Sequence, residues 1–125
     1  MSDSISKYYE SNPLGDIVLE TKTFDDSELV TVAQQRKNTP VFSGVLAYFP
    51  DALREVARCS KVGNDQHNAG QPLHWDRSKS TDELDALTRH LLEAGTIDTD
   101  GIRHSAKVAW RALANLQKEI ENNNK

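Results

Sequence analysis

The sequence predicts a mainly α-helical protein, a small bundle of three principal helices that follows a mixed, possibly β-containing N-terminal arm. Two observations predict this fold class. Apolar residues recur three and four positions apart in three segments of the second half, which is the period of an amphipathic helix. Proline, threonine and glycine stand at the ends of these segments, where helices commonly begin and end. With 125 residues we expect a single domain, divided into an arm at 1–40 and a helical domain at 41–125.

The N-terminal arm is the least regular part of the sequence. Residues 17–24 are rich in β-branched side chains and fit a strand, whereas residues 26–35 fit a short helix with an acidic start. Pro40 then interrupts any regular structure. Because the arm is too polar to hold a core alone, we expect it to pack on the rest of the chain or on a neighbouring subunit.

The first two helices of the expected bundle have recognisable ends. Pro50 suits the first turn of a helix, where its missing N–H costs nothing, and Gly63 is a natural end. Thr81 is the expected N-cap of the second helix, and Gly95 is its expected end. Its apolar stripe is formed by Leu84, Leu87 and Leu91.

The third expected helix has the longest apolar stripe of the chain. The stripe runs over about five turns and consists of Ile102, Ala106, Ala109, Leu113, Leu116 and Ile120. Two neighbouring helices cannot easily cover a stripe of this length, so we expect a homo-oligomer.

Composition excludes several classes of protein. The net charge is −4 and no basic stripe is present, so double-stranded nucleic acid is not an expected partner. The single cysteine excludes an internal disulfide and fits a reducing compartment. The N-terminus lacks a signal-peptide pattern and no apolar run is long enough for a membrane span, so we expect a cytoplasmic protein without a membrane partner.

The long connection at 63–80 is the most informative stretch. It holds two histidines, His67 and His74, together with Trp75 and several charged and amide side chains. Connections between helices in compact domains are usually two to eight residues long, and long polar connections often carry sites. A solvated loop is the alternative. Trp75 could stack on a base or seal a cleft, or it could simply anchor the loop on the bundle.

Charged residues near the second and third helices suggest two further sites. Asp85 and Arg89 share a helix face, either as ligands or as an ordinary surface ion pair, and His90 lies on another face. His104 and Lys107 stand one turn apart at the start of the third helix, where free N–H groups favour anions. A solvated first turn is the alternative.

The turn before the third helix reads Asp98-Thr-Asp-Gly101. Its aspartates could cap the helix or bind a divalent cation through oxygen. No glycine-rich phosphate loop is present, and no Cys/His spacing typical of zinc sites is found.

Five motifs follow one another between residues 61 and 113. They read Lys61-Val-Gly-Asn-Asp-Gln-His-Asn68, Pro72-Leu-His-Trp75, Leu84-Asp-Ala-Leu-Thr-Arg-His-Leu-Leu92, Asp98-x-Asp-Gly-x-Arg-His104 and Ala109-Trp-Arg-Ala-Leu113. As an ordered set, they resemble the phage-encoded dATP/dGTP diphosphohydrolase-like domain. That family is related to the MazG-like all-α nucleoside triphosphate pyrophosphohydrolases. The resemblance covers roughly residues 40–120.

The resemblance implies a helical, oligomeric nucleotide-binding protein that uses Mg²⁺, in the host cytoplasm if the gene belongs to a phage. In MazG-like enzymes, carboxylates on two helices hold the metal against the triphosphate. Here the resemblance implies Glu55, Asp82 and Asp85 as metal ligands and catalytic residues. Glu55 is the only glutamate of the first expected helix, where MazG-like enzymes carry a cluster of them.

The same resemblance implies which residues bind the nucleotide. Arg89 and its neighbours would hold phosphates, and an aromatic or imidazole ring would contact the base or sugar, so that substituting Arg89 by alanine is expected to weaken nucleotide affinity by about tenfold. The expected nucleotide-binding residues are Lys61, His67, Trp75, Arg89, His90, His104 and Lys107.

Three functions stay open from the sequence. The first is a (d)NTP pyrophosphohydrolase that produces (d)NMP and pyrophosphate. The second is a non-catalytic nucleotide-binding protein that sequesters a nucleotide signal of host defence. The third is a structural phage protein. The single glutamate in the first helix favours binding without hydrolysis.

Overall fold

The computed structural model describes residues 31–123, and these residues are mainly helical. Four α-helices and one short π-helix follow in the order α3 (Val32–Lys37), η1 (Phe42–Leu46), α4 (Pro50–His67), α5 (Glu83–Leu91) and α6 (His104–Asn123). Between residues 31 and 123 there is no β-strand, only an isolated β-bridge between Ile97 and Arg103. The predicted mainly α-helical fold is therefore confirmed. The strand expected at 17–24 lies outside the described residues.

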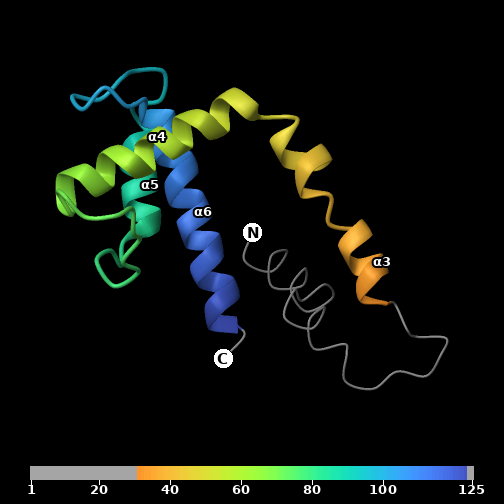
Figure 1. Cartoon of the computed structure of the whole chain (residues 1–125). Coiled ribbons are helices and arrows are strands. Elements are labelled where there is room, and N and C mark those ends of the chain that lie inside the picture. Colours follow the sequence, from red (N-terminus) through yellow and green to blue (C-terminus); the bar gives the residue numbers. More distant parts are fainter. Residues whose placement is uncertain (1–30, 124–125) are drawn as a thin grey trace.

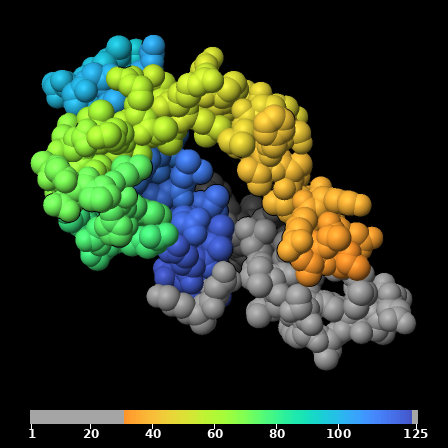
Figure 2. Space-filling view, viewed as in Figure 1, coloured from red at the N-terminus to blue at the C-terminus, as the bar shows by residue number. Residues whose placement is uncertain are grey.

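Helices α4, α5 and α6 form the packed part of the molecule. Helix α6 packs most extensively on α5, and α4 crosses the N-terminal part of α6 (Figure 1). Residues 31–49 extend away from these three helices (Figure 2). The described end of the predicted arm is helical, because Thr31 and Gln34 form a capping box that starts α3.

Helix α4 begins as predicted but ends later. Pro50 occupies its first turn, as the sequence predicts. The predicted end at Gly63 is wrong, because α4 continues to His67. A glycine inside a helix costs only about 1 kcal/mol, which a helix held by its neighbours tolerates. Asn68 is the C-cap residue, and its N–H bonds the Asn64 carbonyl. The connection to α5 therefore spans residues 68–82.

Helix α5 buries a different face from the one that its leucines predict. Leu84 is 60% exposed and Leu91 is 53% exposed. The buried side chains are Glu83 and Ala86. The helix therefore turns a carboxylate and a small residue toward α6 and leaves much of its leucine stripe on the surface.

The apolar core of the described residues is small and lies between α5 and α6, where Ala86, Ile102, Ala106 and Ala114 are buried. Ile102 is fully buried and Ala106 is 6% exposed, as the stripe predicts. Farther along α6, Leu113 and Leu116 are 52% and 41% exposed, so the stripe is only partly covered within one chain. No helix between residues 31 and 123 combines the length and apolar character that crossing a membrane requires.

Candidate functional site

A cleft of about 520 Å³ lies between α4, residues 68–82 and α6. Small-molecule sites commonly enclose about 300–1,000 Å³, so the cleft has the size for a nucleotide. Its wall combines histidines, cations and indole rings, including His67, His74, Trp75, Lys79, Lys107, Trp110 and Arg111.

A second hollow of about 620 Å³ lies between the start of α5 and the end of α6. Its lining holds two cations, Arg77 and Lys118, and five carboxylates, namely Asp82, Glu83, Asp85, Glu119 and Glu121. Carboxylates outnumber cations there, whereas the first cleft is lined by three of each, so this hollow is the less favourable place for a triphosphate. The first cleft is therefore the candidate site.

One buried amide fixes the wall that residues 68–82 contribute to the cleft. The Asn64 side chain is buried, and its Nδ2 donates to the Gln71 carbonyl at 3.1 Å. Its Oδ1 accepts from the His74 N–H at 3.2 Å and from Asn68 Nδ2 at 3.3 Å. Asn64 thus ties the connection to α4, which places Trp75 on α6.

The two tryptophans of the chain meet across the cleft wall. The rings of Trp75 and Trp110 pack edge to face with centroids 5.7 Å apart. The Arg77 guanidinium lies 4.2 Å from the centroid of Trp75. The interpretation of Trp75 as a loop anchor is confirmed, and both rings also line the cleft.

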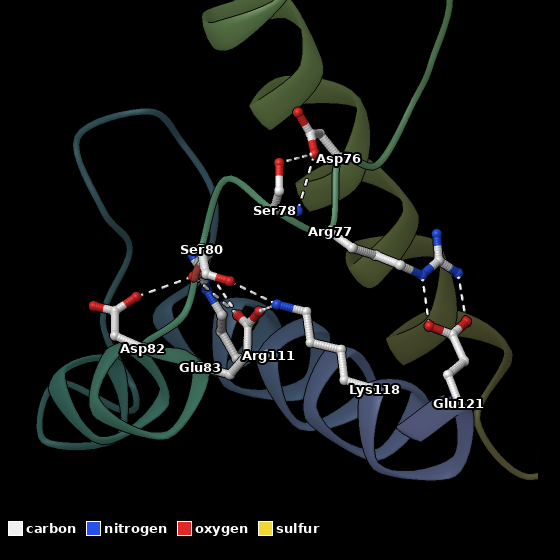
Figure 3. Close-up of polar contacts among 9 residues, drawn as sticks. All are labelled: Asp76, Arg77, Ser78, Ser80, Asp82, Glu83, Arg111, Lys118 and Glu121. Carbon is white, nitrogen blue, oxygen red and sulfur yellow. Dashed lines mark hydrogen bonds and ion pairs between the residues drawn. The ribbon is translucent and has the colours of Figure 1, made fainter. Parts of the chain in front are cut away.

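A buried carboxylate joins α5 to α6 (Figure 3). Glu83 is 5% exposed, and its two oxygens accept from Arg111 at 2.5 Å and from Lys118 at 2.7 Å. Both cations also bond Ser80, Arg111 through the hydroxyl and Lys118 through the carbonyl. Burial raises the pKa of Glu83, but the hydrogen bonds from Lys118 and Arg111 together outweigh this effect and lower it.

Lys107 is enclosed by two aspartates at the start of α6. Its Nζ lies 2.6 Å from Asp98 and 2.7 Å from Asp100. Burial alone lowers the pKa of Lys107, but the hydrogen bonds to Asp100 and Asp98 outweigh it and raise the pKa. The same bond from Lys107, helped by the Thr99 N–H, lowers the pKa of Asp98 to about 2.

This pairing predicts a loss of stability in acid. Asp98 titrates at about 2 in the folded chain against an ordinary value of 3.8, so between these pH values the unfolded chain binds more protons. We expect the free energy of unfolding to fall as the pH is lowered from about 4 to about 2. Urea unfolding across this range should show a shallower fall for Asp98→Asn. Equal slopes for the two proteins would contradict the assignment.

Two histidines face each other beside the cleft. His90 Nδ1 and His104 Nδ1 are 2.9 Å apart, and His104 is 6% exposed. The Glu93 carboxylate lies 3.5 Å from His104 Nε2. Burial, with the charge of Lys107 as a smaller effect, lowers the pKa of His90 below its ordinary 6.5, so its ring is neutral at pH 7. One ring therefore donates a hydrogen bond to the other.

Comparison with known protein families identifies the chain. The family model described as "dATP/dGTP diphosphohydrolase, N-terminal" matches residues 31–125, which is more than half of the sequence. The chain belongs to this family. The resemblance inferred from the sequence motifs is therefore confirmed, and the matched residues contain the cleft, the Glu83 cluster and the histidine pair. No curated protein and no solved structure matches the chain.

The cleft of this family member gathers half of the residues that the sequence nominated. The predicted residues that line it are His67, Trp75, Asp82, His90 and Lys107. His104 lies directly behind His90. Asp82 is also the N-cap residue of α5, where the sequence predicted Thr81 instead.

Four nominated residues lie outside the cleft. Glu55 bonds Arg58 along α4, and Lys61 bonds Asp65 in the same way. Asp85 is exposed and lines the second hollow. Arg89, with 64% of its side chain exposed, bonds Asp82 at 3.1 Å, so the ion pair with Asp85 that the sequence offered as an alternative is replaced by one with Asp82.

The predicted metal ligands do not come together. In the described part of the chain, one group of three histidine, cysteine or acidic side chains has ligand atoms within 4.8 Å of one another, and it contains neither Glu55 nor Asp82 nor Asp85. A three-carboxylate magnesium site at these positions therefore does not fit the structure.

Sequence reasoning missed Glu83, Arg111 and Lys118 as a cluster. Their separations of 28 and 35 residues leave no local pattern, and Glu83 reads as an ordinary acidic residue in the first turn of a helix. Asn64 was also missed, because it lies beyond the predicted end of α4. A buried position for a charged residue is a tertiary property that helical spacing alone does not reveal.

Proposed function

We propose that the cleft between α4, residues 68–82 and α6 binds a purine deoxynucleoside triphosphate. The family description names dATP and dGTP. The observation that carries the proposal is that two indole rings and three cations line the same cleft. The cations are Lys79, Lys107 and Arg111. Indoles stack on bases, and cations form charge-assisted bonds with phosphates.

Lys79 is the cation of the cleft best placed to receive phosphate. Its Nζ donates to the amide oxygen of Asn68 at 3.0 Å. By contrast, Lys107 and Arg111 already bond carboxylates. A phosphate can replace the neutral amide partner of Lys79 at little cost, whereas it would have to compete with a carboxylate at the other two. We expect the triphosphate to lie toward Lys79 and His67.

Lys79→Met should weaken the affinity for dATP or dGTP by about tenfold or more, since a charge-assisted hydrogen bond contributes roughly 1.5–3 kcal/mol. Because Lys79 is exposed, the melting temperature without nucleotide should stay near the wild-type value. Lys61→Met removes the same charge outside the cleft and serves as the matched control. Equal losses in the two variants, measured by calorimetric titration, would show that net charge rather than the cleft determines affinity.

The finer proposal is that the bound nucleotide is hydrolysed to the monophosphate and pyrophosphate. The oxygen of a water molecule would bond the α-phosphorus, and the bond between that phosphorus and the oxygen that bridges to the β-phosphate would break. Pyrophosphate would leave with the bridging oxygen, and the proton of the water would pass to bulk solvent. Magnesium at Glu55, Asp82 and Asp85 has no part in this proposal, because those residues are not assembled.

A second candidate is binding without hydrolysis, to sequester a nucleotide. A specific observation favours it: the acidic side chains lining the cleft already have partners. Asp82 bonds Arg89, Asp100 bonds Lys107, and Asp76 accepts from Ser78. A paired carboxylate with a lowered pKa is a weak general base.

One experiment separates these functions. The full chain is titrated with the four dNTPs and four NTPs in the presence of Mg²⁺, by calorimetry and by chromatography of the products. Selective binding of dATP or dGTP with release of pyrophosphate supports the hydrolase. Selective binding with intact nucleotide supports sequestration. Absence of binding to every nucleotide would overturn the proposed site.

We also propose that the protein is a homo-oligomer, in the cytoplasm of the host if the gene belongs to a phage. Residues 41–49 carry a surface of exposed apolar side chains, among them Phe42 and Tyr48, which are 73% and 70% exposed. Contiguous apolar surface of this kind is typical of protein interfaces.

Substitution in this surface tests the assembly. Light scattering of the wild-type chain should give a mass of at least two subunits, and Phe42→Glu should shift it toward the monomer. Lys37→Glu changes charge at a polar exposed position and should leave the mass unchanged. A wild-type monomer at micromolar concentration would contradict the proposal.

A further inference from the structure

Two histidines and one aspartate converge where α5 passes into α6. His90 lies in the last turn of α5, His104 is the first residue of α6, and Asp98 lies in the connection between them. Each has one ligand atom that lies within 4.8 Å of the other two. His104 is buried and the other two are half-buried, so this is not an exposed acidic patch.

We propose that His90, His104 and Asp98 bind a divalent transition metal of the zinc class. Imidazole nitrogen suits Zn²⁺, Co²⁺ and Ni²⁺, whereas Mg²⁺ prefers oxygen ligands. Three protein ligands with an additional water make the usual open zinc site. The site differs from the expected magnesium site in its residues and in its metal.

The spacing of the two histidines supports this site. Their Nδ1 atoms are 2.9 Å apart. Two nitrogens on a tetrahedral Zn²⁺, with bonds of about 2.0–2.1 Å, lie about 3.3–3.4 Å apart. The two rings therefore need to move apart by only a few tenths of an ångström to admit the ion. The proton that one ring now holds on Nδ1 moves to its Nε2, so both rings bind as neutral histidines.

Outer contacts hold two of the ligands in place. His104 Nε2 lies 3.5 Å from the Glu93 carboxylate, which can accept its N–H when Nδ1 binds metal. Asp98 is held through both oxygens, since its Oδ2 bonds Lys107 and its Oδ1 accepts from the Thr99 N–H at 2.7 Å. The same Oδ1 lies 4.0 Å from His104 Nε2. Because Asp100 also pairs with Lys107, the lysine charge beside the site is compensated.

The backbone of the connection places Asp98 beside the histidines. The Asp98 N–H donates to the Ile102 carbonyl at 2.9 Å, and the bridge between Ile97 and Arg103 closes the connection. Gly101 adopts a φ of 81°, which L residues with side chains rarely adopt. The bound metal would join the ends of α5 and α6, so it should stabilise the fold whether or not a nucleotide binds in the cleft.

The test uses the full chain, without an affinity tag and without nucleotide. Co²⁺ and Zn²⁺ are titrated separately, followed by visible absorption for Co²⁺ and by calorimetry for Zn²⁺. We expect one metal per chain, the strong d–d bands of tetrahedral Co²⁺, and a rise in melting temperature of about 10 °C at zinc concentrations near 100 times Kd.

His90→Gln should weaken Zn²⁺ binding by more than about 100-fold, and circular dichroism checks that this variant keeps its helices. His74→Gln removes a histidine outside the group and should bind zinc as the wild type does. Asp98→Asn gives a second variant that should also lose affinity. Absence of zinc binding, equal losses in the His90 and His74 variants, or a thiolate-to-cobalt band from Cys59 would each overturn the proposed site.

Discussion

Glu83→Ala is expected to lower the free energy of unfolding by about 3 kcal/mol, the largest effect on stability that we expect from one substitution. Removing this buried carboxylate leaves Arg111 and Lys118 facing each other without their shared partner. Breaking a buried ion pair typically costs about 3–5 kcal/mol. The Arg111 and Lys118 side chains are 28% and 22% exposed, so water can partly solvate their charges. The expected loss of stability is therefore near the lower end of this range of about 3–5 kcal/mol.

Urea unfolding followed by circular dichroism measures this loss. Glu55→Ala is the matched control, because Glu55 pairs with a single arginine along the surface of α4 and should cost less than about 1 kcal/mol. If Glu83→Ala stays within about 1 kcal/mol of the wild type, the cluster does not fasten α5 to α6.

Asn64→Ala is expected to affect both stability and nucleotide affinity. The substitution removes the partner of the Gln71 carbonyl and of the His74 N–H, which are only partly buried, so the expected loss of stability is about 1 kcal/mol, the lower end of the cost of an unsatisfied buried polar group. Residues 68–82 would then be less firmly held against α4. Because this segment carries Trp75 and Lys79, the affinity for the best nucleotide should fall by about tenfold, since ordering the segment would then oppose binding.

The two effects of Asn64→Ala must be measured together. Urea unfolding gives the stability, and calorimetric titration well below the melting temperature gives the affinity of the folded chain. Asn115→Ala removes an amide that bonds Glu119 along α6 and should change neither quantity by much. Wild-type affinity in a destabilised Asn64→Ala protein would mean that the connection does not form part of the binding site.

Local patterns predicted the helices, because their period and their end residues are properties of short segments. Pro50 marked the start of α4 correctly. The end of α4 predicted at Gly63 was wrong, since a glycine weakens a helix without ending it when the following residues have tertiary partners. The buried face of α5 was also predicted wrongly. The leucine stripe identifies an apolar face, but it does not show that much of this face stays exposed instead of packing on α6.

The sequence predicted which segment carries the candidate site, but not which side chains contact one another there. The polar connection before α5 does line the cleft with Trp75, and His67, which the structure places at the end of α4, lines it too. The pairing of His90 with His104, by contrast, depends on the path of the connection between α5 and α6. The enclosure of Lys107 depends on the same path, so a residue nominated for phosphate binding already has two carboxylate partners. Helical spacing places side chains on a face but does not identify the opposite partner.

The central claim is that the nucleotide lies in the cleft between α4 and α6, and tryptophan fluorescence tests it most directly. The chain has two tryptophans, Trp75 and Trp110, and both line that cleft. Titration with dATP or dGTP should therefore change the emission saturably, with the same Kd that calorimetry gives, and Lys79→Met should shift both curves together. Calorimetric binding of dATP or dGTP without any change in tryptophan emission would place the nucleotide elsewhere and contradict this account.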